Sequence, residues 1–302
     1  PLFISWPMVF IAIIAVLTWG AMLKNGGKLP EQTPPGPSFM PNDFPLTHLW
    51  FLYELLLCYI ALLGVRWVMA RFEWYAQLQM WTDRIVARLM SFLPELWLAL
   101  PLTAALLMQS EWYQWFGVPT PDKTLYPNWP SAAAYGVAFA LGWVLHRQSA
   151  LLLALAKRCY WHLAAALICT GACFYITGAG PKLMPADMAS METVVYALCY
   201  SVGAWAWTFG LIGLGQRVFS QFSPVRRYLA DASYWIYIAH IPLVMALQTV
   251  MAEMPMAWWL KLPLMFTIAF AILLLSYHLL VRNSFIGQAL NGRKYASLQP
   301  AQ

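Results

Sequence analysis

Long apolar runs alternate with short polar segments along the chain. A helix that crosses a bilayer core roughly 30 Å thick needs about twenty apolar residues. Eight runs come close to this length, over residues 2–23, 46–65, 96–110, 129–145, 159–177, 193–216, 232–252 and 262–281. The third run is short, and residues 92–95 can extend it. The pattern therefore predicts an all-α fold: a polytopic transmembrane helical bundle with about eight spans.

Two segments between the runs have patterns of their own. Residues 71–92 carry apolar side chains at helical spacing among basic ones, at Trp74, Leu78, Trp81, Ile85 and Leu89. This pattern is typical of an amphipathic helix in the membrane interface, here joining two spans on the inner leaflet, although a functional lid is an alternative. Residues 30–41 contain five prolines, which exclude a regular helix. We expect a loop there that can cover an external opening.

Basic residues between the runs predict the orientation, because Lys and Arg are retained on the cytoplasmic side. Segments on one side hold thirteen of them: Arg66, Arg71, Arg84, Arg88, Arg147, Lys157, Arg158, Arg217, Arg226, Arg227, Arg282, Arg293 and Lys294. The other side holds five: Lys24, Lys28, Lys123, Lys182 and Lys261. Both ends are therefore expected in the cytoplasm. We expect one membrane domain over residues 1–290 and a cytoplasmic tail over residues 291–302.

Composition excludes several classes of protein. Of 302 residues, 61% are hydrophobic and only 10% are charged, too few charges for a soluble domain. The net charge of +6 is not gathered into a dense basic run, so we expect no nucleic-acid partner. The five cysteines form no CxxC pair and lie in or at the edge of apolar stretches. We interpret them as small apolar residues, and expect neither a disulfide framework nor a metal site.

Ionisable groups at membrane depth are the first functional candidates, because burying them in lipid is costly. Glu54 is the only carboxylate within the eight runs, and it must face the bundle interior. It is either a hydrogen-bonded clamp between helices or a participant in substrate binding or proton handling. His240 has a similar expected depth, whereas His48 and His278 lie near the ends of their runs.

His240 shares a helix face with two tyrosines. Tyr234, Tyr237 and His240 follow one another at intervals of three residues, which places their side chains on neighbouring parts of one face. This stripe is expected to line a polar cavity, where an imidazole acts as a base, a proton relay or a packing residue. His146 and His162 are expected at the membrane interface.

Three segments resemble the integral-membrane acyltransferase-3 family. They are His48-Leu49-Trp50-Phe51-Leu52, Phe139-Ala140-Leu141-Gly142 before His146-Arg147, and Ser233-Tyr234-Trp235-Ile236-Tyr237-Ile238-Ala239-His240-Ile241-Pro242-Leu243. Within the family, the chain is most similar to periplasmic-glucan succinyltransferases and related polysaccharide O-acyltransferases. Family members typically have ten helices. The resemblance therefore implies a chain that lacks the first two family helices and is catalytically incomplete, with the catalytic residues expected upstream of Pro1.

The resemblance implies transfer of an acetyl or succinyl group from cytoplasmic acyl-CoA to a hydroxyl of a glycan or lipid-linked sugar, in the inner membrane. Membrane lipids are its other partners, and acyl-CoA is a donor substrate rather than a bound cofactor. We hypothesise that His48, Trp50, Glu54, Tyr237 and His240 line the acceptor or acyl tunnel. Among them, His48, Glu54 and His240 would support the upstream catalytic His, while Trp50 and Tyr237 would bind substrate.

Other interpretations stay open. Arg226 and Arg227 are candidates for binding the CoA phosphates, because both are expected on the cytoplasmic side, where they can also serve only as membrane anchors. A transporter or flippase of a small solute or lipid-linked sugar would use Glu54 and His240 for proton coupling. Transporters usually contain internal repeats, and the sequence has no convincing one. A noncatalytic membrane scaffold is the third class.

Overall fold

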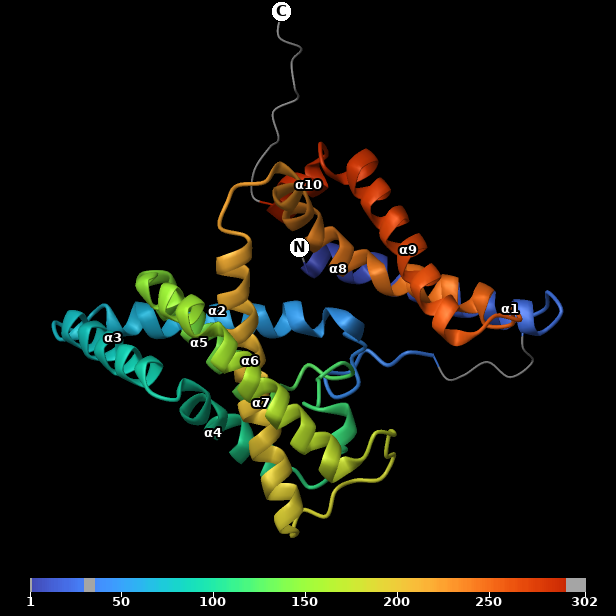
Figure 1. Cartoon of the computed structure of the whole chain (residues 1–302). Helices are drawn as coiled ribbons and strands as arrows, with labels where there is room; N and C mark the ends of the chain where they lie inside the picture. Colours follow the sequence, from blue (N-terminus) through green and yellow to red (C-terminus); the bar gives the residue numbers. More distant parts are fainter. Residues whose placement is uncertain (1, 30–35, 292–302) are drawn as a thin grey trace, which may run out of the picture. The chain divides into compact units, whose positions relative to one another are not determined.

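The described structure is entirely helical and divides into two compact units. The computed structural model (Figure 1) describes residues 2–29 and 36–291, and its elements within these ranges are helices and their connections. Unit 1 comprises the described parts of residues 1–39, 45–49 and 222–302, and unit 2 comprises residues 40–44 and 50–221. Pro1 and most of the expected cytoplasmic tail, with Arg293 and Lys294, lie outside the described residues.

Unit 2 contains six α-helices in sequence order. They are α2 (Trp50–Met69), α3 (Tyr75–Ser91), α4 (Pro94–Leu107), α5 (Trp129–Arg147), α6 (Ala150–Thr177) and α7 (Met191–Val218), with the short helix η2 (Gln114–Phe116) after α4. Side-chain caps fix two of the starts: Asn128 accepts from the Ser131 amide, and Ser190 accepts from the Thr193 amide. Each cap satisfies an amide that the first helical turn leaves unpaired.

The α6 and α7 helices pack against each other at glycines. A Cβ atom added at Gly213 would lie 2.5 Å from the carbonyl oxygen of Leu155 and 2.8 Å from the Cβ atom of Cys159. At Gly210 it would lie 2.7 Å from the Leu163 side chain. Small residues allow this close backbone approach, which is a common way of packing helices in membranes. The seam holds the longest two helices of unit 2 together.

A sharp break separates α3 from α4. The two helices are bent by 104°, and Leu93 between them adopts a left-handed backbone with φ 44°. Pro94 then opens α4, in the first turn where proline costs no hydrogen bond. The sequence predicts an amphipathic helix here, and α3 is helical over most of that range. Its place in the membrane interface stays a prediction.

Unit 1 joins the beginning of the chain to its last third. It contains α1 (Leu2–Lys24), the short helix η1 (Thr47–Leu49), α8 (Pro224–Met251), α9 (Trp258–Ser276), the π-helical turn η3 (Tyr277–Val281) and α10 (Phe285–Asn291). Trp235 on α8 donates a hydrogen bond from Nε1 to Ser276 Oγ at the end of α9 (3.0 Å). Gly20 on α1 lies against Thr249 on α8.

The number of spans differs from the sequence prediction. Six described helices are long and apolar enough to cross a membrane, or seven if α3 and α4 form one broken span. The expected third span is too short to cross a membrane by itself, because α4 has 14 residues and is about 21 Å long, which is shorter than the bilayer core. The expected fourth span, α5, is long enough, but its Trp, Pro, Ser and Gly residues lower its mean hydropathy.

Helix directions within each unit agree with the predicted alternation of sides. In unit 1, α1 and α8 run parallel, since residues 4–12 face residues 235–242 and Gly20 faces Thr249. In unit 2, α6 and α7 run antiparallel, since Leu155 faces Gly213 and Cys169 faces Gly203. These are the relations expected from the basic-residue distribution. Which side is cytoplasmic stays a prediction.

The glycine seam gives a first testable prediction. Gly213→Ala should lower the stability of the protein by about 1–3 kcal/mol, because the added Cβ must displace backbone atoms of α6. Gly215→Ala is the matched control on the same helix, since nothing lies within 4 Å of its added Cβ. Thermal unfolding of both variants in detergent measures the difference. Equal midpoints for the two variants would contradict the seam.

Candidate functional site

Two histidines and a tyrosine come together in unit 1. His48 in η1 and His240 in α8 have ring centroids 5.0 Å apart, and the Tyr237 ring lies 5.7 Å from His48 and 6.0 Å from His240. We call these three residues the histidine cluster. All three are half-buried. Residues almost 190 positions apart in the sequence, from two of the segments that resemble the acyltransferase-3 family, therefore form one site.

Backbone carbonyls fix the protonation pattern of both imidazoles. His48 Nε2 lies 3.1 Å from the Ile238 carbonyl oxygen, and His240 Nδ1 lies 2.7 Å from the Tyr237 carbonyl oxygen. A carbonyl only accepts, so each of these nitrogens carries the proton. In the neutral rings, the opposite nitrogens, His48 Nδ1 and His240 Nε2, then have free lone pairs. His48 Nδ1 is buried and has no hydrogen-bond partner among the described residues.

The backbone at His48 is irregular and held by neighbouring helices. Thr47 has a φ of 54°, which is rare for a β-branched residue and marks local strain. Trp6 on α1 donates from Nε1 to the Pro45 carbonyl (2.9 Å), and Tyr237 on α8 donates to the His48 carbonyl (2.5 Å). Such strain is often found at functional sites, and these side chains satisfy carbonyls that no helix pairs.

Glu54 in unit 2 forms a buried hydrogen bond. Its Oε1 accepts from Ser131 Oγ in the first turn of α5 (2.9 Å), and only 4% of the residue is exposed. Oε2 has no hydrogen-bond partner among the described residues. Trp50, one turn earlier on α2, packs on Tyr135 with ring centroids 5.3 Å apart. Glu54 thus faces the protein interior, as predicted from its position in an apolar run.

The five residues of the predicted tunnel fall into both units. The structure brings His48, Tyr237 and His240 together in unit 1, whereas Trp50 and Glu54 belong to unit 2. Their participation in one tunnel stays a prediction.

The two arginines at the start of α8 are differently placed. Arg227 Nε lies 3.4 Å from Asp231 Oδ2, one turn further along α8, and its side chain is about half exposed. The Arg226 amide is capped by Ser223 Oγ (3.4 Å), so this residue belongs to the first helical turn. At 1.5 Å per residue, Arg226 lies about 21 Å along α8 from His240. Both arginines remain candidates for phosphate binding.

Sequence reasoning missed a buried ion pair in unit 2. Glu95 Oε1 pairs with His162 Nδ1, and the two residues are only 7% and 6% exposed. α6 begins at Ala150 and places His162 about three turns inside the helix, and the interfacial position of His162 stays a prediction. Because α4 begins at Pro94, Glu95 is a second buried carboxylate besides Glu54. The position of Glu95 directly beside an apolar run was the sequence feature that could have indicated its burial.

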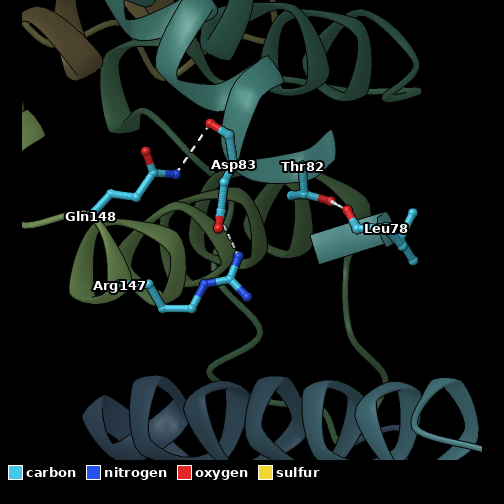
Figure 2. A network of polar contacts seen from close by, with 5 residues as sticks. All are labelled: Leu78, Thr82, Asp83, Arg147 and Gln148. Carbon is cyan, nitrogen blue, oxygen red and sulfur yellow. Dashed lines mark hydrogen bonds and ion pairs between the residues drawn. The ribbon is translucent and has the colours of Figure 1, made fainter. Parts of the chain in front are cut away.

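A second ion pair links α3 to the end of α5. Figure 2 shows Arg147 paired with the Asp83 carboxylate, while Gln148 donates to the Asp83 carbonyl (3.2 Å). The same figure shows Thr82 donating to the Leu78 carbonyl one turn back on α3 (2.9 Å). The Arg147 and Asp83 side chains are about a third exposed, unlike the Glu95–His162 pair. His146 next to them is exposed.

The two ion pairs differ in their expected effect on stability. Glu95→Ala should destabilise the protein by about 3–5 kcal/mol, because it leaves His162 buried without a partner. Asp83→Ala, which breaks the partly exposed pair, should cost only about 0–1 kcal/mol. Thermal unfolding in detergent compares them. A similar loss of stability in both variants would show that burial does not make the Glu95–His162 pair more important for stability than the Asp83–Arg147 pair.

Among residues 2–29 and 36–291, no three His, Cys, Asp or Glu side chains come together in a way that would hold a metal ion. The five cysteines are free thiols.

Comparison with protein families identifies the chain. No curated protein and no solved structure shows a significant match to it. Residues 1–279 match the acyltransferase domain of the acyltransferase-3 family. The matched range includes the histidine cluster and both buried carboxylates. With its membrane-spanning helices, this chain therefore belongs to the acyltransferase-3 family of membrane acyltransferases.

Proposed function

We propose that this acyltransferase moves an acetyl or succinyl group from cytoplasmic acyl-CoA to a hydroxyl of a glycan or lipid-linked sugar, in the inner membrane. The observation that carries the O-acyl transfer is the histidine cluster, in which a backbone carbonyl occupies one nitrogen of each imidazole and leaves the other nitrogen for proton transfer. A hydroxyl nucleophile must lose its proton, and a neutral imidazole is suited to accept it near neutral pH.

The transfer itself balances without a further reactant. The acceptor hydroxyl gives its proton to a base as its oxygen forms a bond to the thioester carbonyl carbon. The carbon–sulfur bond then breaks, and CoA leaves as the thiol after taking up a proton. In this proposal His48 and His240 receive or relay the proton and support the family's catalytic His. Tyr237 holds the η1 backbone in place.

The choice of donor and acceptor has separate support. Arg226 and Arg227, in the first turn of α8, lie at an end that the charge distribution predicts to be cytoplasmic, where CoA is found. A planar guanidinium binds phosphate oxygens with two hydrogen bonds. The glycan acceptor is supported by the resemblance to polysaccharide O-acyltransferases in the His48 and His240 segments. Trp50 and Tyr135 offer aromatic surface for binding a sugar.

The test of this proposal is acyl transfer in membranes. Membranes containing the protein are incubated with radiolabelled acetyl-CoA or succinyl-CoA, beside membranes that lack it. The expected result is label in the glycan or lipid-linked sugar fraction of the membranes that contain the protein. Label that is released by mild alkali would indicate an ester. No incorporation from either donor, with the protein folded in the membrane, would overturn the proposal.

Substitutions of the two histidines separate a chemical role from a packing role. His48→Ala and His240→Ala should each lower the transfer rate by about 10²–10⁴, the usual contribution of a positioned acid or base. His48→Gln and His240→Asn should be as inactive, because the amide keeps the hydrogen bond to the carbonyl but cannot accept a proton as imidazole does.

Exposed His146→Ala is the control and should keep full activity. Rates are measured with the labelled donors, after protein levels in the membrane have been matched. Recovery of activity in the Gln and Asn variants would show that these histidines serve packing only.

A further inference from the structure

Unit 2 contains a cavity that the proposed chemistry does not use. It has a volume of about 490 Å³ and lies between α6, α7 and η2. This volume falls within the range of small-molecule sites, about 300–1,000 Å³. Its wall is largely aromatic: Trp115, Phe174, Tyr196, Tyr200 and Trp207. The lining comes from the last two turns of α6 and from Tyr196 to Trp207 of α7, and the end of α6 and the start of α7 lead to the predicted outer face.

Hydrogen bonds around this cavity leave its hydroxyl groups available. Trp207 Nε1 donates to Thr170 Oγ1 (3.0 Å), and the Val118 amide donates to the Tyr200 hydroxyl oxygen (3.2 Å). Both hydroxyls act as acceptors in these bonds, so each retains its own proton to donate. Tyr196 donates to the Gln114 carbonyl (3.0 Å), so its oxygen can accept. Donors and an acceptor thus line one cavity.

The lining selects the class of ligand. No Asp, Glu, Lys, Arg or His is among the described residues that line the cavity, so a charged ligand would find no counter-charge. A purely apolar ligand would leave the protons of the Thr170 and Tyr200 hydroxyls without an acceptor, which costs free energy where water is excluded. A neutral sugar ring satisfies both conditions, since it has apolar faces for aromatic rings and hydroxyl groups at its edge.

A smaller cavity extends the site. It has a volume of about 180 Å³ and shares Trp115 and Thr177 with the aromatic cavity. It continues to Lys182 and Met184 in the connection between α6 and α7. A chain of sugars can therefore continue from the first cavity toward the predicted outer side.

We infer that the aromatic cavity binds a neutral sugar ring of the glycan acceptor. This inference rests on the proposed function for the glycan as acceptor, and it adds a binding site in unit 2 formed by Trp115, Thr170, Tyr196, Tyr200 and Trp207. The site holds the glycan and takes no part in proton transfer.

Cysteines of the chain provide a direct test, because Cys173 and Cys199 line the cavity while Cys58 lies on α2 outside it. Two single-cysteine proteins, one retaining Cys199 and one retaining Cys58, are labelled in nanodiscs with a small neutral thiol reagent. Neutral glucose tetrasaccharides with α or β linkages are the probes. At about ten times the Kd of a bound tetrasaccharide, labelling of Cys199 should slow about tenfold by mass action, and labelling of Cys58 should not change.

Two tryptophan variants sharpen the result. Trp115→Ala should raise the sugar concentration for half-protection about tenfold, because a wall of the cavity is lost. Trp129→Ala is the control, since Trp129 is 76% exposed at the start of α5 and does not line the cavity. Retention of radiolabelled tetrasaccharide by the purified protein, in the same two variants, gives a second measurement that needs no reactive thiol.

Saturable retention that Trp115→Ala weakens and Trp129→Ala does not would support the inference. Absence of both protection and retention with every tetrasaccharide would overturn it. So would protection of Cys199 by short-chain lipids but not by sugars, which would identify a lipid site. These experiments measure sugar binding and not acyl transfer. Absence of binding would therefore overturn only the sugar site, and the proposed function would still be tested by the transfer assay. Sugar binding without acyl transfer would support the site and contradict the proposed function.

Discussion

A bilayer core contains no water, so each polar group at membrane depth must find its partner inside the protein. In unit 2 this constraint appears as hydrogen bonds between helices: Glu54 accepts from Ser131, and Trp205 donates to the Leu98 carbonyl. The Glu95–His162 pair joins α4 to α6 in the same way. Helix positions in this unit therefore depend on a few polar pairs as well as on glycine contacts.

The same constraint governs the irregular backbone next to His48. Non-helical backbone is tolerated at membrane depth only where protein or an internal cavity satisfies it. Here, side chains of α1 and α8 donate to the carbonyls of Pro45 and His48. The imidazole of His48 donates in return to the Ile238 carbonyl. One set of contacts thus stabilises the segment and fixes the orientation of the His48 ring.

Hydrophobic periodicity predicted the helices well, because an apolar run of about twenty residues has few other structures available. It predicted about eight spans, whereas six described helices, or seven if α3 and α4 form one broken span, are long and apolar enough to cross a membrane. The burial of Glu54 could be predicted, because it is the only carboxylate within a long apolar run. The Glu95–His162 pair did not, because its members are 67 residues apart and each lies beside residues typical of an interface. The aromatic cavity also depends on contacts between helices, which periodicity does not contain.

Parallel packing of α1 against α8 has a consequence for synthesis of the protein. About 200 residues separate the two helices, and ribosomes add roughly 5–20 residues per second, so α1 spends about 10–40 s in the membrane before α8 exists. During this time α1 must be stable in lipid without α8. Its mean hydropathy of 2.2 is high, and its Ser5 and Thr18 hydroxyls donate to carbonyls of their own helix. The composition of α1 thus suits a helix that must stay in lipid until α8 is made.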